Sequence, residues 1–544
     1  MKSILIILIS FIICLQVQAQ SFSKNNSQRP KLVVGIVIDQ MRYDYLYRFN
    51  KNYGKGGFNR LMNDGTNFTF AHFNYSPTNT APGHASIFTG TTPFYHGIIG
   101  NDWYDRFAKK MIYSMNDTSV RSIGSNDKEG QMSPRRLLAT TMTDQLKLAT
   151  NNEAKVISIS LKNRGAILPG GHTADAAYWY DNLTGDFISS SYYMETLPVW
   201  VVKFNERKLA DHFMSNGWKL SLPESRYLLA SNTESNYEKD VFKESKNSFP
   251  HYFNNLKEKE KYDVFETTAF GNTIVAEFAK EVLLNEKLGK GKETDFFTIS
   301  FSSTDHVAHD YGTFSLEVED TYIKLDSLLA DLLNMLDKQV GKGNYLLFLT
   351  SDHAGIETPS YLRDQRLPTG ELNNKRFLDS LKLFCINEYG DESLIENLSN
   401  RQIFLNRELI KKNKWDIHKI ERAIADYIRN TFPVVTSIFT RDDFEKDVAT
   451  REPINTILNG FNPVISGDIA FNLQPGYLSN FLEQGSTHST SYSYDTHVPM
   501  LFYGWRIPNQ TLNTPVFIVD IAATISNLLG ITEPSASIGI PLIK

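Results

Sequence analysis

Cysteine is nearly absent from this chain of 544 residues, which contains only Cys14 and Cys385. Cys14 lies in an apolar N-terminal segment that we predict to be removed, so Cys385 would be alone in the mature protein and no intramolecular disulfide could form. A lipoprotein anchor at Cys14 is disfavoured because Ile13 stands where such an anchor has a small residue. The fold must therefore be stabilised by its hydrophobic core and by any metal that it binds.

A basic excess, internal repeats and membrane-length apolar runs are absent as well. The formal net charge is -5 and 22% of the residues are charged, so the composition gives no support to nucleic acid as a partner. No stretch, the apolar N-terminus included, reaches the roughly 20 apolar residues that a membrane-spanning helix needs. The composition is typical of a soluble globular protein.

The N-terminus has the three parts of a secretory signal peptide. Lys2 is followed by an apolar run from Ile4 to Leu15, and the segment from Val17 to Ala19 supplies a cleavage site with small residues. We therefore predict a signal peptide over residues 1–19, a mobile polar lead-in over residues 20–30, and a mature protein in the periplasm or secreted. No membrane anchor would remain after cleavage.

Three aliphatic runs predict strands that are buried on both faces, as in a parallel sheet covered by helices. In open α/β sheets, ligands bind beyond the carboxyl ends of the strands. Each run leads to an aspartate, so we expect the three carboxylates to converge on one site. The runs are Leu32 to Ile38, Phe296 to Phe301 and Tyr345 to Thr350, and the aspartates are Asp39, Asp305 and Asp352.

Helical patterns alternate with these strands. Asn272 to Leu284 and Leu316 to Leu336 have apolar residues at helical spacing. A last helix is predicted from Asp520, which could cap it, to Leu529, where Gly530 would end it. The alternation of strand and helix predicts the α/β class with a mostly parallel sheet.

The motifs predict one large domain, although the length alone would suggest about three or four. They extend from Asp39 to beyond His488, so we expect a single catalytic domain over residues 31–544. Two less regular stretches, about 169–270 and 357–462, are predicted to be insertions or subdomains, and the second contains a basic helix near Ile417 to Arg429.

Two motifs near the predicted strand ends offer metal ligands. Asp305 and His309 are four residues apart, so a helical turn after the strand would place both side chains on one face toward one ion. Asp352 and His353 are adjacent ligands at another strand end. Either motif alone is more often a solvated helix face or a local ion pair.

Joined to Asp39 and to the segment from Thr487 to Ser489, these motifs make the chain resemble the alkaline phosphatase superfamily, in particular its PafA-type branch. The resemblance covers nearly the whole mature chain and implies a three-layer sandwich with a central, mostly parallel sheet. Further matching segments are Lys31 to Gly35, Asp39 to Arg42, Thr80 with Gly83 and His84, Gly100 to Asp105, Ser160 to Arg164, and Tyr494 to Pro499.

The resemblance implies two Zn2+ ions per chain, each with three protein ligands and an open position for catalysis. Manganese stays an alternative because related mutases use it. The family usually has Asp-His-Gly at the third strand end, whereas Ala354 here precedes Gly355, which puts the metal geometry in question. One ion would be held by Asp305, His309 and His488, and the other by Asp39, Asp352 and His353, with Thr80 completing the second site.

The resemblance also implies that Thr80 is the nucleophile and forms a covalent phosphothreonine. Contact with a divalent cation lowers the pKa of a hydroxyl and makes it a usable nucleophile. Pro82 predicts the start of a helix running toward Thr89, whose free amides would face the phosphate. Without the surrounding motifs, Thr80 would be interpreted as a helix cap.

Other side chains are needed for the phosphate oxygens that the metals do not reach. By resemblance, Asn101, Lys162 and Arg164 would hold them, with Lys162 in place of the third metal of other alkaline phosphatases. Because they are two residues apart, Lys162 and Arg164 are expected on the same side of an extended segment, and two solvated surface cations are the alternative. His497 is expected to orient ligands, whereas His84 is expected to be structural.

These observations predict an alkaline phosphatase that hydrolyses small-molecule phosphate monoesters, scavenges phosphate outside the cell and is a monomer. A phosphodiesterase of the same superfamily is the main alternative, although Lys162 and Arg164 argue against it. A sulfatase is disfavoured because the segment from Ser76 to Thr80 contains no cysteine. The third alternative is an exported phosphate- or metal-binding protein without catalysis.

Overall fold

The computed structural model describes residues 29–543 except 230–235, 245–246, 447–453 and 481. The predicted signal peptide, residues 1–19, lies outside the described residues, as does most of the predicted lead-in. Among the helices of the described part of the chain, none combines the length and apolarity that a membrane crossing needs.

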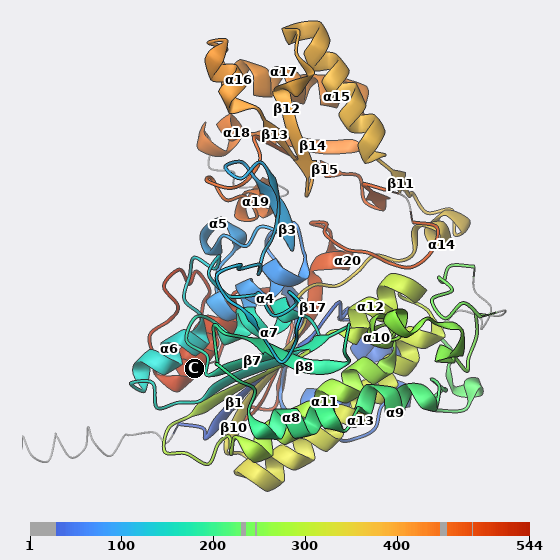
Figure 1. The fold of residues 1–544 in the computed structure, drawn as a ribbon, viewed down its shortest axis with the longest axis vertical. Helices are drawn as coiled ribbons and strands as arrows, with labels where there is room; N and C mark the ends of the chain where they lie inside the picture. Colours follow the sequence, from blue (N-terminus) through green and yellow to red (C-terminus); the bar gives the residue numbers. More distant parts are fainter. Residues whose placement is uncertain (1–28, 230–235, 245–246, 447–453, 481, 544) are drawn as a thin grey trace, which may run out of the picture.

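A large mixed sheet forms the centre of the molecule (Figure 1). Strand β1 lies in its middle and pairs in parallel with β9 and β10, and the parallel order continues through β6 and β7. The predicted α/β class with a mostly parallel sheet is confirmed. Its strands, in spatial order, are β18 (Gln510–Leu512), β2 (Thr66–His72), β17 (His497–Gly504), β10 (Tyr345–Thr350), β1 (Leu32–Ile38), β9 (Asp295–Phe301), β6 (Val156–Ser160), β7 (Ala176–Asp181), β8 (Asp186–Ser190) and β5 (Ser122–Ile123), and β19 (Val516–Phe517) also pairs with β2.

Helices cover both faces of this sheet, so β1 is buried on both sides. Val34 and Ile36 belong to one hydrophobic core, and Val33 and Val37 belong to the core on the opposite face, as the two-residue period of a strand requires. The first core is covered by α8 (Val199–Glu206), α9 (Leu209–Ser215), α10 (Glu258–Glu266), α11 (Ala269–Asn285), α12 (Ser303–Tyr311) and α13 (Leu316–Leu336), and the second by α4 (Thr80–Thr89), α6 (Met142–Ala149) and α21 (Asp520–Leu529).

The long helices have local start and stop signals. The Ser315 hydroxyl accepts a hydrogen bond from the amide of Val318 and caps α13. Helix α21 ends at Gly530, whose φ of 59° is the left-handed conformation that glycine adopts at little cost. Asp520 does not cap α21 as predicted, because its carboxylate accepts hydrogen bonds from Phe517 and Ile540 instead.

A second, four-stranded sheet lies beyond one end of the central sheet, in the orange part of Figure 1. Helices α15 (Asn374–Tyr389) and α17 (Ile417–Thr431) pack on it around their own hydrophobic core. The first predicted insertion, in contrast, includes β7 and β8 of the central sheet, and the boundaries of both insertions stay predictions. The strands of the second sheet are β12 (Ile395–Ser399), β13 (Gln402–Leu405), β15 (Ile469–Leu473) and β14 (Val435–Thr440).

A hairpin of β3 (Asp102–Asp105) and β4 (Lys110–Tyr113) connects the two parts. The rings of Tyr104 and Phe404 pack edge to face with their centroids 5.3 Å apart. The Asn400 side-chain amide donates a hydrogen bond to the carbonyl of Asp102 over 2.7 Å. The second sheet is therefore fixed to the loop that follows Asn101.

Candidate active site

Three aspartates converge at the carboxyl ends of the central parallel strands. Asp39 follows β1 directly, and its amide donates to the carbonyl of Phe301 at the end of β9. Gln40 adopts a φ of 58°, which turns the chain sharply after Asp39. Its amide then donates to the carboxylate of Asp352 over 3.2 Å. The sheet register thus brings together side chains that lie more than 300 positions apart in sequence.

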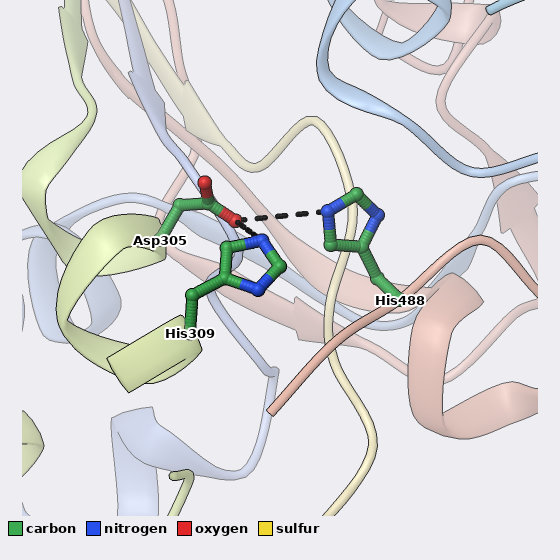
Figure 2. A group of neighbouring side chains, drawn as sticks. All are labelled: Asp305, His309 and His488. Atoms are coloured by element: carbon green, nitrogen blue, oxygen red, sulfur yellow. Dashed lines mark ion pairs between the residues drawn. The ribbon is translucent and has the colours of Figure 1, made fainter. Parts of the chain in front are cut away.

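One cluster of ligand atoms contains Asp305, His309 and His488 (Figure 2). Asp305 and His309 lie one turn apart on α12, and His309 Nε2 is 3.2 Å from Asp305 Oδ1. His488 approaches from a distant segment, with its Nε2 3.8 Å from the same oxygen. The helical turn expected after this strand therefore presents both residues to one centre.

A second cluster lies beside the first and shares Asp305 with it. Its close ligand atoms come from Asp39, Asp305 and His353, and His353 Nε2 is 3.4 Å from Asp39 Oδ1. Asp352, expected to belong to this cluster, has its Oδ2 3.8 Å from His353 Nε2. The structure thus places the six expected ligand residues together, while the role of each in holding a metal stays a proposal.

Backbone carbonyls orient all three histidines. Each ring places its Nδ1 on a carbonyl oxygen, which leaves Nε2 directed to the cluster, as in histidine ligands of metals. Burial lowers the pKa of His353 and His488, and metal binding requires this neutral form. The three pairs are His309 with Ser486 at 2.8 Å, His488 with Thr78 at 2.7 Å and His353 with Ala354 at 3.0 Å.

The residues of these clusters fit a divalent cation. Asp39 Oδ1, Asp352 Oδ2 and His353 Nε2 are buried and form no hydrogen bond with the described residues. Burial and the neighbouring carboxylates raise the pKa of Asp39 well above its usual value. Buried polar atoms without partners and clustered negative charge are costly unless a cation compensates them. Oxygen and imidazole ligands suit zinc.

Thr80 is the first residue of α4 and is only 1% exposed. Its hydroxyl forms no hydrogen bond with the described residues, so it does not act as a helix cap. The helix begins two residues before Pro82, where we had expected the start. The Asn101 side-chain oxygen accepts a hydrogen bond from the amide of Ala81 over 2.9 Å, which places Asn101 beside Thr80.

Gly83 allows α4 to lie against the chain at Asp352. A Cβ at residue 83 would be 2.2 Å from the Asp352 carbonyl oxygen. We expect Gly83→Ala to reduce the free energy of unfolding by about 1–3 kcal/mol, because the helix must move away. Thermal unfolding and kcat/KM would measure the effect, and activity should fall as well because Thr80 and Asp352 separate.

Gly291→Ala is the matched control for this substitution. A Cβ at residue 291 would meet nothing within 4 Å. The control should therefore unfold at the wild-type temperature. Equal unfolding temperatures for both variants would show that the contact at Gly83 is not tight.

Lys162 and Arg164 do not lie on one extended segment as expected. Helix α7 (Asn163–Gly170) begins almost directly after β6, so Lys162 is its N-cap residue and Arg164 lies in its first turn. Lys162 is 6% exposed, which also excludes the alternative of a solvated surface lysine. Its ammonium group is 2.7 Å from Asp39 Oδ2 and also contacts Asp305.

Arg164 keeps hydrogen-bonding capacity at this site. Its Nη1 donates to the hydroxyl of Tyr113 over 3.2 Å. Its Nε is buried and forms no hydrogen bond within the described part of the chain. A buried donor of this kind is expected to be satisfied by a ligand or water. Tyr113 is a contact that its position in the sequence did not indicate.

His497 does not orient a metal ligand. It begins β17 opposite His72, and its Nε2 hydrogen-bonds the carbonyl of Thr69 at 2.9 Å. Asp495 supplies support instead, because its carbonyl oxygen accepts the amide of Ala354, next to His353. The extra Ala354 is thus held in place. His84 is structural as expected and hydrogen-bonds the carbonyl of Thr80.

Comparisons with known proteins identify the family of this chain. Residues 33–488 match the model of the family described as type I phosphodiesterase / nucleotide pyrophosphatase. Alkaline phosphatase PhoV of Synechococcus elongatus is 44% identical over 94% of this chain and 92% of that protein. The chain belongs to the alkaline phosphatase superfamily.

Two further matches come from the PafA-type branch of this superfamily. Alkaline phosphatase PafA of Elizabethkingia meningoseptica is 41% identical, covering 96% of this chain and 95% of that protein. The crystal structure of wild-type alkaline phosphatase PafA superposes with a TM-score of 0.91 at 39% identity, covering 95% of this chain and 99% of that chain. The predicted superfamily, fold and enzyme class are confirmed.

Proposed function

We propose that the protein is an exported, metal-dependent phosphate monoester hydrolase that attacks phosphorus with the hydroxyl of Thr80. The observation that carries this proposal is the position of Thr80 at the N-terminus of α4. Its carbonyl is hydrogen-bonded by His84, whose Nδ1 is also 3.3 Å from the buried carboxylate of Asp352. Relatives named alkaline phosphatases support the reaction class. The N-terminal pattern supports a protein that is in the periplasm or secreted. This location supports a broad role in scavenging phosphate outside the cell.

Two Zn2+ ions are the proposed metals. When bound, such ions lower the pKa of a hydroxyl and stabilise charge on attacking and leaving oxygens. The buried atoms without partners and the two overlapping clusters support two ions rather than one. One set of ligands is Asp305, His309 and His488, and the other is Asp39, Asp352 and His353 with Thr80.

The protein residues carry out two displacements on phosphorus. In the first, a bond forms between Thr80 Oγ1 and phosphorus, the bond to the ester oxygen breaks, and the alcohol leaves with a proton. In the second, water attacks the phosphothreonine, inorganic phosphate leaves, and the hydroxyl regains its proton. Asn101 fixes the start of α4, so the attacking oxygen keeps one position through both steps.

Lys162 and Arg164 favour a monoester over a diester. A monoester carries nearly two negative charges. Lys162 is buried and Arg164 is half-buried at the cluster, and the pKa of both cations is raised in part by Asp39 and Asp305. A phosphodiesterase would need an apolar surface for its second ester group. The description of the matching family includes phosphodiesterases, so the choice between the two activities must be tested. A binding protein without catalysis is disfavoured because the nucleophile and ligand set are complete.

We expect Lys162→Ala and Arg164→Ala to lower kcat/KM for an aryl phosphate monoester by roughly 100-fold, because each removes a charged hydrogen bond in a buried site. The matching methyl aryl diester should lose much less, since it carries one charge fewer. Steady-state kinetics with both substrates measures the ratio. Zinc content must be measured in parallel, because Lys162 contacts two proposed ligands.

Lys292→Ala is the control, since Lys292 is exposed and its nearest ion-pair partner is the adjacent Glu293. It should leave both activities unchanged. Equal losses for the monoester and the diester in the Lys162 and Arg164 variants would mean that these cations do not bind the phosphate group. A wild-type preference for the diester would overturn the assignment as a monoesterase.

A further inference from the structure

A cavity of about 320 Å³ adjoins the metal-ligand clusters. His488 lines it as well as belonging to the first cluster, and Ser489 continues the same wall. The tip of the hairpin between β12 and β13, which carries Ser399 and Arg401, also lines it. The cavity therefore extends from the proposed reaction centre to the second sheet.

Arg401 gives this cavity a positive charge. Among the described residues, no Asp or Glu lines the cavity and Arg401 is the only Lys or Arg in its lining. The buried carboxylate of Asp495 acts on Arg401 electrostatically, but no described carboxylate forms an ion pair with it. Its guanidinium Nη1 donates to the carbonyl of Ser489 over 3.1 Å. Five donors are available on a guanidinium, so most of its capacity is unused by the described residues.

Arg401 is half-buried in this position. Desolvation lowers the pKa of Arg401 from its usual value, although Asp495 acts in the opposite direction. A partly desolvated guanidinium gains from a charged hydrogen-bond partner, and a ligand with negative charge would supply one. Ser399 Oγ, also in the lining, is buried without a hydrogen bond to the described residues and offers a second polar contact.

The backbone holds Arg401 rigidly at this place. Asn400 and Arg401 have φ values of 51° and 57°, the pair of left-handed residues that a tight two-residue hairpin turn requires. Asparagine accepts this conformation readily, but arginine rarely occupies it. Asn400 anchors the turn to Asp102, and Arg401 anchors it to Ser489. The turn thus bridges the Asn101 loop and the His488 loop.

We propose that this cavity is the leaving-group subsite and that Arg401 binds an anionic substituent, a carboxylate or a phosphate-type group, on the alcohol that leaves. The inference rests on the proposed phosphomonoesterase function. In-line displacement directs the ester oxygen away from Thr80. Because Thr80 belongs to the ligand set of Asp39, Asp352 and His353, the other set, Asp305, His309 and His488, would face that oxygen, and His488 also lines the cavity. The substrates favoured would be monoesters of alcohols that carry a second negative charge.

The test compares phenyl phosphate with 4-carboxyphenyl phosphate and 4-phosphonophenyl phosphate in the wild type and in Arg401→Gln. The quantity is the ratio of kcat/KM for each charged substrate to that for phenyl phosphate. The electronic effect of the substituent on the leaving group cancels between the two proteins. We expect the ratio to fall roughly 10-fold in Arg401→Gln, the value of a charge-assisted hydrogen bond. The substituent with the larger fall identifies the group that Arg401 binds.

Arg429→Gln is the matched control, because it removes an exposed positive charge from α17 of the same part of the molecule, where Arg429 pairs with Asp426. It should leave the ratios unchanged. Arg401→Lys keeps the charge without the planar fork and should lose part of the preference. If Arg401→Gln does not fold, the Lys variant decides by the same ratio.

Unchanged ratios in the Arg401 variants would overturn the subsite. If all three substrates lose activity equally, Arg401 acts only by holding Ser489, and if none loses activity, Arg401 has no role in binding them. Absence of phenyl phosphate hydrolysis in the wild type would instead contradict the proposed function. The two failures are therefore distinguishable.

Discussion

Thr80→Ala is expected to lower kcat/KM for an aryl phosphate monoester by roughly 1,000-fold or more, because the bond to phosphorus can no longer form. The hydroxyl has no hydrogen bond to the described residues, so its removal should leave the unfolding temperature close to the wild-type value. Rapid acid quench followed by mass spectrometry should detect phosphate on Thr80 in the wild type and on no residue in the variant.

Two variants control for this result. Thr80→Ser keeps the hydroxyl and should retain most of the activity and the covalent phosphate. Thr89→Ala removes a buried hydroxyl from the other end of α4, where it donates to the carbonyl of Ala85. This second change should affect stability rather than chemistry. Substantial turnover by Thr80→Ala would mean that water attacks the substrate directly, and the covalent mechanism would be wrong.

Strands and helices with a continuous apolar signal were predictable from the sequence. The bounds expected for β1, β10 and α13 are those observed, and β9 begins one residue earlier than expected. The buried strands β1 and β10 are almost wholly apolar, so their ends are marked where polar residues begin. Because these ends lie at one edge of the sheet, the convergence of the three aspartates also followed from the sequence.

Contacts that depend on the exact turn after a strand were not predictable. Lys162 and Arg164 were expected on the same side of an extended segment, but α7 starts at Asn163, so Lys162 is its N-cap residue and Arg164 lies in its first turn. His497 follows Asp495 by two residues, yet β17 begins there and its pairing carries the ring toward His72. A difference of one or two residues in where an element begins decides which face a side chain occupies.

Contacts between the second sheet and the rest of the molecule had no sequence signal. Arg401 lies in a stretch that was predicted only to be an insertion or subdomain. Its approach to Ser489 depends on how the second sheet docks on the β3 hairpin. Such docking is set by packing, as between Tyr104 and Phe404, and no local pattern of residues encodes it.

Removal of the metals with a chelator is expected to lower activity by roughly 100-fold or more, and Zn2+ should restore it, because the pKa shift of the nucleophile depends on the cation. The unfolding temperature should fall too. Asp39, Asp305 and Asp352 are buried close together. Among the described Lys and Arg residues, only Lys162 forms ion pairs with Asp39 and Asp305, so little of this negative charge is compensated without a bound cation. Calorimetry with and without Zn2+ would measure the change.

A comparison of His309→Ala with His306→Ala tests whether His309 itself, and not any histidine of α12, is needed to bind a metal. His309 points to Asp305, whereas His306, three residues earlier, lies 3.3 Å from Glu266. Elemental analysis should find a loss of about one zinc per chain in His309→Ala, since an ion held by three protein ligands binds far more weakly with two. His306→Ala should keep both ions and its activity. Undiminished zinc in His309→Ala would remove His309 from the ligand set, and the leaving-group side of the site would need another metal position.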